Sequence, residues 1–173
     1  MVGYPLEPRM SPVWITFYSV RGGVGRSTLL ALCALELARV GRRVVVVDFD
    51  LEAPGLDILL TPLGAPETDH VRAGVVDYLA RTSKGDQVSL DDIVLPRELP
   101  GDYKGRLFLI PAGRCDEAYL ANLDTLDFSR FYERPGLLNP VRSLRADIDE
   151  QLSPDVVLVD SRTGYSDTAL FTL

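Results

Sequence analysis

Short apolar runs alternate along the chain with longer stretches whose apolar residues recur at helical spacing. Short β-branched runs are typical of strands buried in a parallel sheet, whereas apolar spacing of three or four residues is typical of helices that cover it. The alternation therefore predicts an α/β fold with a mostly parallel sheet flanked by helices. Strands are predicted over residues 14–20, 44–47, 106–113 and 155–160, and helices over 27–40, around 75–81 and over 141–152.

Three segments differ from this alternation. Residues 1–12 contain three prolines and no periodic pattern, so we expect an irregular lead-in before one domain over residues 13–173. Residues 61–105 are richer in Pro, Gly and charge, which predicts a variable excursion over the surface. No element is predicted over 114–140.

The predicted helix over 27–40 is apolar on nearly every side, so we expect it to pack deep against the sheet.

Composition limits the class of protein. With 173 residues and 46% apolar content, the chain has the size of one domain with a real core. The balance of 18 basic and 25 acidic side chains gives a formal charge of −7, which argues against a nucleic-acid or anionic-membrane site. Cys33 and Cys115 have neither metal-ligand spacing nor the pairing of a disulfide framework. Without a leader pattern or a membrane-length apolar run, the expected setting is cytoplasmic.

A glycine-rich turn lies between the first strand and the first helix, in "VWITFYSVRGGVGRSTLLAL". Gly22, Gly23 and Gly25 allow the backbone to wrap around an anion, and the following helix start adds its positive dipole end. A basic side chain at Arg26 can reach β and γ phosphates, and the hydroxyl of Ser27 can bind Mg²⁺. The general P-loop pattern has a glycine at position 20 and a lysine at position 26, so the match fails at both.

Two strands end in carboxylates near this turn. Asp48 and Asp50 follow the run of valines, and Asp160 ends "DVVLVD", with Gly164 four residues later. Open α/β sheets bind ligands at the carboxyl ends of their strands, so we expect these groups to meet there. Acid-tipped strands are typical of a magnesium site, and a nearby glycine lets a backbone N–H approach a terminal phosphate.

These motifs resemble the deviant Walker A ATPases of the MinD/ParA class, a SIMIBI-type P-loop NTPase family whose loop reads KGGxGK[ST]. The stretch "RGGVGRST" keeps the glycines and the hydroxyl but has Arg21 and Arg26 in place of both lysines. The chain is most similar to the KGGVGR-motif variant subgroup, through "ITFYS", "GGVGRS", "DLEAPGL" and "DSRTG". Within that subgroup Arg26 is ordinary, and Arg21 is the departure.

The resemblance implies ATP and Mg²⁺ as cofactors and a role for each motif residue. Arg21 would reach the nucleotide of a partner subunit, Asp50 would orient the attacking water, Asp160 would be the Walker B acid and Gly164 would sense the γ-phosphate. Catalytic roles are thus expected for Arg21, Arg26 and Asp50. Metal binding is expected for Ser27, Asp48 and Asp160, and nucleotide binding for Gly22, Gly23, Val24, Gly25, Arg26, Ser27, Thr28 and Gly164.

The resemblance also implies a nucleotide-dependent homodimer and a protein partner that the sequence does not identify. Because the family domain continues for several strands and helices beyond the Walker B region, the chain is expected to be C-terminally truncated. Some readings stay open at this point. Asp50 is either catalytic or the cap of the following helix, and Arg162 is a switch residue or, preferentially, a solvated or ion-paired side chain.

Three functions from different classes remain compatible with the sequence. The first is an ATP-hydrolysing dimerisation switch, and the second is a module that holds nucleotide without turnover, since arginine is bulkier than lysine and delivers its charge less compactly. The third is a protein-tyrosine kinase, because bacterial tyrosine kinases share this loop chemistry. The tyrosine-rich tail that accompanies such kinases is not found in the sequence, so this reading ranks last.

Overall fold

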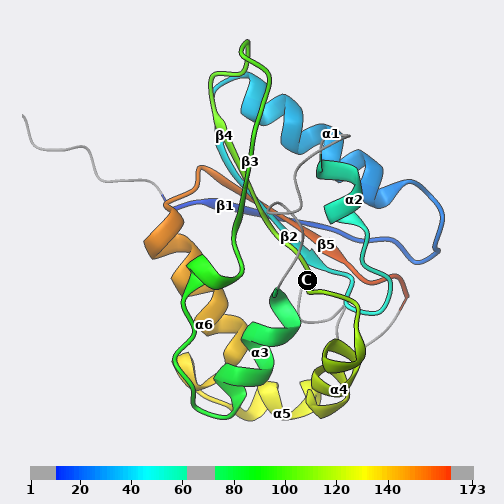
Figure 1. The fold of residues 1–173 in the computed structure, drawn as a ribbon, viewed down its shortest axis with the longest axis vertical. Coiled ribbons are helices and arrows are strands. Elements are labelled where there is room, and N and C mark those ends of the chain that lie inside the picture. The colour runs from blue at the N-terminus through cyan, green and yellow to red at the C-terminus, as the bar shows by residue number, and fades with distance from the viewer. Residues whose placement is uncertain (1–10, 62–72, 165–173) are drawn as a thin grey trace, which may run out of the picture.

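The computed structural model describes residues 11–61 and 73–164 (Figure 1). Most of the predicted lead-in, part of the predicted excursion and the end of the predicted domain lie outside these residues. Within them, no helix is long and apolar enough to span a membrane.

Five strands form one mixed sheet in the order β1-β5-β2-β4-β3. The first four pair in parallel, as predicted, whereas β3 pairs antiparallel to β4 at the edge. The strands are β1 (Val13–Phe17), β2 (Arg43–Phe49), β3 (Leu95–Arg97), β4 (Arg106–Ile110) and β5 (Val156–Ser161).

Helices cover both faces of this sheet (Figure 1). One face carries α1 (Arg26–Arg39) and the short α2 (Leu56–Leu60). The other carries the remaining helices, with short turns between them. These are α3 (Val75–Ser83), η2 (Leu90–Asp92), α4 (Glu117–Thr125), α5 (Phe128–Glu133), η3 (Gly136–Leu138), α6 (Pro140–Asp147) and the π-helical turn η4 (Ile148–Leu152).

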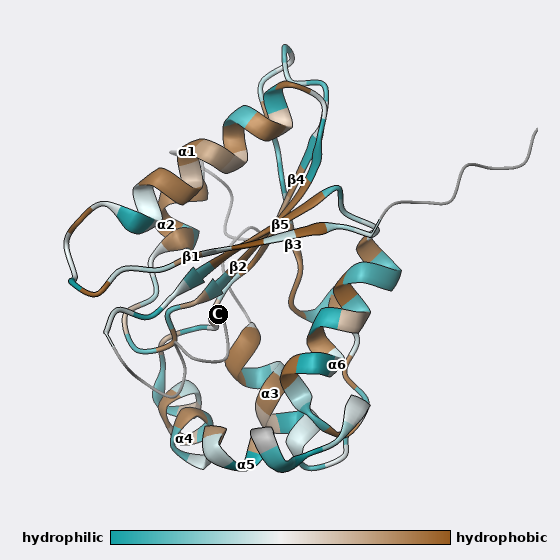
Figure 2. Ribbon diagram, turned by 180° about the vertical axis from the view of Figure 1, so that it is seen from behind, coloured by the Kyte–Doolittle hydropathy of each residue, from teal (hydrophilic) through white to brown (hydrophobic). Residues whose placement is uncertain are grey.

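Alternating valines of β2 build two separate cores, one on each face. Val44 and Val46 pack with α1 and α2, whereas Val45 and Val47 pack with α3 and α6. All four are at most 2% exposed, because a central parallel strand is covered on both faces. Figure 2 shows the hydrophobic residues concentrated along the strands and on the helix sides that face them.

The predicted surface excursion is wrong for its second half. Helix α3, whose existence was predicted, is buried through Val76, Tyr78 and Leu79, and the following chain adds β3 to the sheet. The high content of Pro, Gly and charged residues suggested a loop, but such residues lie here at turns next to a buried amphipathic helix. The stretch without predicted elements holds α4 and α5, and each begins at an aspartate, Asp116 or Asp127, whose side chain caps it.

The first helix is less buried than predicted. Ala34 and Ala38 face the sheet and are fully buried, but Leu29 and Leu32 are 55% and 60% exposed. Small alanines let the helix approach the sheet closely, and the leucines lie on its outer side. The first strand is also shorter than predicted, because the chain leaves the sheet after Phe17.

One tight backbone approach gives a test of this packing. A Cβ atom built at Gly105 would lie 2.1 Å from the carbonyl oxygen of Arg42, whereas one at Gly101 would meet nothing within 4 Å. The close neighbours of Gly105 are backbone atoms, which cannot rotate away. We expect Gly105→Ala to lower the free energy of unfolding in urea by at least about 2 kcal/mol. The matched Gly101→Ala should change it by under about 0.5 kcal/mol; equal effects of both substitutions would contradict the described packing.

Candidate functional site

The glycine loop forms an open backbone turn between β1 and α1. Gly23 and Gly25 have φ of 73° and 83°, in the left-handed region that glycine adopts without strain. Cβ atoms at Gly22, Gly23 or Gly25 would meet nothing within 4 Å, so the turn encloses space next to its own backbone. Helix α1 begins directly after it, where the Leu29 N–H donates to the Gly25 carbonyl. The loop thus presents backbone next to open space, together with a helix start.

Adjacent strands bring two acids side by side at the carboxyl edge of the sheet. In the parallel register, Asp48 of β2 pairs with Asp160 of β5, and both are 1% exposed. The predicted meeting of the two acid-tipped strands beside the glycine loop is therefore confirmed, because β5 lies between β1 and β2.

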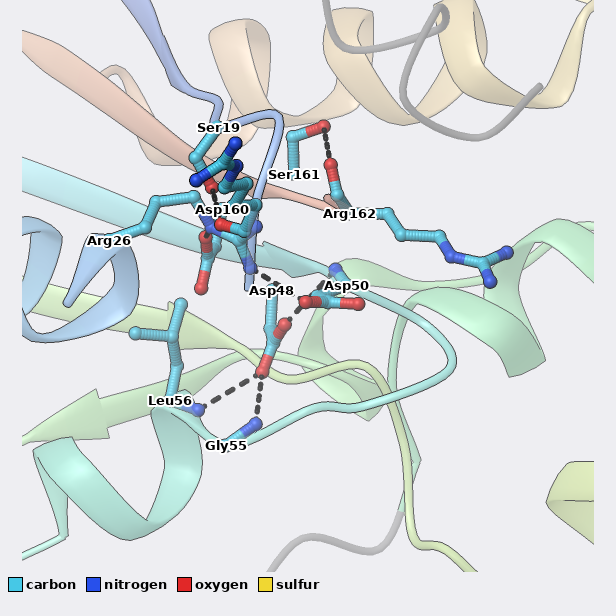
Figure 3. Close-up of polar contacts among 10 residues, drawn as sticks. Ser19, Arg26, Asp48, Asp50, Gly55, Leu56, Asp160, Ser161 and Arg162 are labelled. Carbon is cyan, nitrogen blue, oxygen red and sulfur yellow. Dashed lines mark hydrogen bonds and ion pairs between the residues drawn. The ribbon is translucent and has the colours of Figure 1, made fainter. Parts of the chain in front are cut away.

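Asp48 is held by the backbone of the chain that follows it. Its carboxylate accepts hydrogen bonds from the N–H groups of Asp50, Gly55 and Leu56, at 3.2, 3.1 and 3.1 Å (Figure 3). Burial raises the pKa of Asp48 to about 7, against the opposing effect of these donors. The contacts give Asp48 a structural role at the start of α2, and its predicted role as a metal ligand stays a prediction.

Arg26 connects the other two acids. Its Nη2 donates to Asp50 at 2.6 Å and its Nε donates to Asp160. The side chains of Arg26, Asp50 and Asp160 are 8%, 11% and 2% exposed, so the three charges are largely withdrawn from water. The third guanidinium nitrogen, Nη1, is buried and has no hydrogen-bond partner.

Asp160 has hydrogen-bond partners from two residues at the start of α1, Arg26 and Ser27. Burial raises its pKa, while hydrogen bonds from Ser27 and Arg26 lower it, and the net shift is upward. Ser27 is the hydroxyl predicted to bind Mg²⁺, and its side chain forms a hydrogen bond with Asp160, the acid predicted to be the Walker B residue. Among the residues described, no group of three or more acidic, His or Cys side chains is arranged to hold a metal by itself. A metal here would require oxygens from a ligand or from water.

The chain after β5 is attached to the residues that follow β1. The N–H of Gly164 donates to the carbonyl of Ser19 at 3.2 Å, and its carbonyl accepts from the Tyr18 hydroxyl at 3.0 Å. Arg162 forms an ion pair with Glu52 and points away from the three acids, which confirms the ion-paired reading of this residue (Figure 3). Arg21 is exposed beside the loop.

Sequence reasoning missed a residue that fixes the loop after Asp50. The Tyr119 hydroxyl donates to the Leu51 carbonyl at 2.5 Å, although α4 follows this loop by more than sixty residues. Tyr119 is 4% exposed and packs against Gly113, where a Cβ would lie 2.8 Å from its ring. The capping aspartate Asp116 was the available signal for α4, but the sequence carries no sign of a contact with Leu51.

Known proteins share both the motifs and the fold. A family model described as "Cellulose biosynthesis protein BcsQ" matches residues 13–55. The septum site-determining protein MinD of Helicobacter pylori is 48% identical over 46 residues, which is 27% of this chain and 17% of that protein. The sequence similarity to these known proteins rests on short segments, and the matched residues make up less than half of the chain.

Solved structures extend the likeness to the whole fold. The septum site-determining protein MinD of Pyrococcus horikoshii, complexed with Mg-ADP, superposes with a TM-score of 0.62 at 24% identity and covers 93% of this chain. Cobyrinic acid a,c-diamide synthase of Mycobacterium smegmatis, with bound ATP analog and magnesium, has a TM-score of 0.63 at 22% identity and covers 95% of this chain.

The chain spans about half the length of these solved proteins, 53% and 56% respectively. Their sequence identities are low enough that they show the fold alone, and membership of the arginine-containing subgroup stays a prediction. The chain is therefore similar to P-loop proteins of the MinD/ParA class. The similarity lies in the sequence of its N-terminal segment, in the glycine loop with its two acid-tipped strands, and in the shared parallel sheet.

Proposed function

We propose that the protein binds Mg-ATP at the glycine loop and hydrolyses it as a nucleotide-dependent dimerisation switch. The observation that carries this proposal is the buried Nη1 of Arg26, which has no partner although it lies in a site lined by the open glycine loop, Asp50 and Asp160. An unsatisfied buried donor is costly, and a phosphate oxygen is a strong acceptor for a guanidinium.

The phosphate groups fit the backbone of the loop. Gly22 to Gly25 leave open space where side chains would stand, and the first N–H groups of α1 have no acceptor within the helix. We expect the segment from Gly22 through Thr28, Val24 included, to surround the phosphates. The relatives solved with Mg-ADP or with an ATP analog and magnesium support the same ligand class for this chain.

A magnesium ion would bind beside Ser27, with Asp160 and the phosphates close by. When bound, Mg²⁺ supplies positive charge that offsets the charge of the phosphates. The chain's own residues do the rest. The Ser27 hydroxyl now bonded to Asp160 would turn its oxygen toward the metal, and the Asp48 and Asp160 carboxylates would hold the charge or bound water of the ion.

Hydrolysis needs a water aligned with the terminal phosphate. Asp50 lies within 2.6 Å of the Arg26 guanidinium, so its carboxylate is already at the site and can orient that water once released. The Gly164 N–H donates to the Ser19 carbonyl in this structure and would leave that carbonyl to meet the terminal phosphate. Exposed Arg21 is free to extend to the nucleotide of a second subunit, where an arginine supplied in trans stabilises developing charge.

A second candidate is nucleotide binding without turnover. The observation that favours it is the ion pair between Arg26 and Asp50, which occupies the carboxylate that would orient water. The two candidates share the same binding site and differ only in whether Asp50 is released when nucleotide binds. The homodimer, the protein partner and the cytoplasmic setting remain parts of the first proposal.

Substitution of the two loop arginines tests the binding site. Arg26→Ala removes charge-assisted hydrogen bonds worth about 1.5–3 kcal/mol each, so we expect Mg-ATP affinity to fall at least about tenfold. Arg21→Ala, which removes an exposed guanidinium from the same loop, should leave monomer affinity within about threefold. Isothermal calorimetry with Mg-ATP measures both; loss of binding in both variants would place Arg21 on the nucleotide of its own subunit.

Substitution of Asp50 tests turnover. We expect Asp50→Ala to keep bound ATP but to lower the steady-state ATPase rate about 100-fold, because the attacking water loses its acceptor. Asp86→Ala, in the exposed loop after α3, is the matched control and should leave the rate unchanged. Phosphate release within about threefold of the unsubstituted protein would leave Asp50 only as the ion-pair partner of Arg26, because the alternative role as the cap of α2 is wrong: the Asp48 carboxylate accepts from the N–H groups there. A protein that binds Mg-ATP but releases no phosphate at any protein concentration would support binding without turnover.

A further inference from the structure

We propose that the Arg26 guanidinium stands in for the divalent cation in the nucleotide-free site, so that free Mg²⁺ is excluded until a phosphate draws the arginine away. The inference rests on the proposed function for the identity of the ligand. It concerns the order in which the nucleotide and the metal ion bind. In this order Arg26 controls whether the metal ion can bind.

The geometry shows one cation shared between two acids from different strands. Nε and Nη2 are neighbouring donors of one rigid planar group, and they reach Asp160 and Asp50 at the same time. Figure 3 shows Arg26 extending from the start of α1 to Asp160, beside Asp48 and Asp50. A lysine ammonium is a single point on a flexible stem and has no such fork. The bridge is therefore a property of the arginine at this position.

Burial explains why a cation must be present. Two carboxylates with 11% and 2% side-chain exposure repel each other and lose most of their hydration, and Asp48 adds a third acid at the same edge. A shared positive group offsets that cost. Either the guanidinium or a metal ion can do so, and the two positive groups would repel each other if both occupied the site. The charge of Arg26 thus already offsets part of the negative charge of the nucleotide-free site.

The unpaired Nη1 shows how the exchange begins. This nitrogen is buried and lacks a partner, so its two N–H groups can bind a phosphate oxygen that enters the site before either ion pair breaks. As further phosphate oxygens replace the carboxylates around the guanidinium, Asp50 and Asp160 are released. They then require a new cation, which is the point at which the metal binds. Nucleotide binding and metal binding are coupled through this single side chain.

Mn²⁺ titration without nucleotide tests the exclusion directly, since the bound ion is read by electron paramagnetic resonance and needs no catalysis. Arg26→Gln keeps a polar side chain, although a shorter one, and removes the charge. We expect it to bind Mn²⁺ at least about tenfold more tightly than the unsubstituted protein, because the two acids lose their counter-cation. Asp160→Asn in the same background should remove this gain, and Arg21→Gln alone should bind no more Mn²⁺ than the unsubstituted protein. Arg26→Lys serves as a second, more conservative variant and should show an intermediate affinity.

The proposal is overturned if folded Arg26→Gln and Arg26→Lys bind Mn²⁺ no more tightly than the unsubstituted protein. It is also overturned if the unsubstituted protein binds ADP but binds Mn²⁺ equally well with and without it. A gain in Arg26→Gln together with no ADP binding by the unsubstituted protein has a different meaning. That result keeps Arg26 in the place of the cation and rejects the proposed nucleotide function, so the two failures are distinguishable.

Discussion

The neutralisation of buried acids at one edge of the sheet is the constraint on which the rest of the site depends. Asp48 and Asp160 are adjacent because β2 and β5 pair in parallel, and Asp50 follows directly after β2. Burial penalises each charge, so each carboxylate needs donors close to it. The chain supplies them from two sources. Backbone N–H groups surround Asp48, and the Arg26 guanidinium serves the other two.

Those donors also shape the loops around the site. The bonds to Asp48 hold the chain that leads into α2, and Tyr119 holds the same loop from the opposite helical layer through the Leu51 carbonyl. Gly164 is tied to the end of β1 in a similar way. The three segments predicted to contact nucleotide are therefore attached to rigid strands and helices. Because its loops are held in this way, we expect the site to change when a few side chains exchange their hydrogen-bond or ion-pair partners. An exchange at Arg26, which two acids share, changes the charge balance of the site most.

The arginine in the glycine loop is more than a conservative replacement for lysine. Both residues carry one positive charge, but the planar fork of Arg26 satisfies two acids together and leaves a further donor unpaired. A residue with three directional donors can be shared between carboxylates and phosphates in sequence. This gives a physical reason for arginine at a position where the general pattern has lysine, in terms of what the side chain does when no nucleotide is bound.

Much of the fold was readable from local patterns. The valine run of β2, the acid-tipped strands and the glycine turn predicted a parallel sheet with a phosphate loop at its carboxyl edge, because these signals depend on neighbours in sequence. Elements whose sequences mix apolar, polar and charged residues were not predicted correctly. Helix α3 was expected at the surface, and α4 and β3 were not expected, because their burial depends on contacts with segments far away in the chain.

The residues of the site were predictable as a set, but their partners were not. Sequence alone placed Arg26, Asp50 and Asp160 at one edge, since the carboxyl ends of parallel strands share one edge and each motif follows the end of a predicted strand. It assigned Arg26 to phosphate, and only the tertiary structure showed that the same guanidinium joins two acids that are 24 and 134 positions away. The local sequence determines which charges reach the site. The balance of those charges depends on distances between residues of separate strands. The sheet sets these distances by placing β5 between β1 and β2.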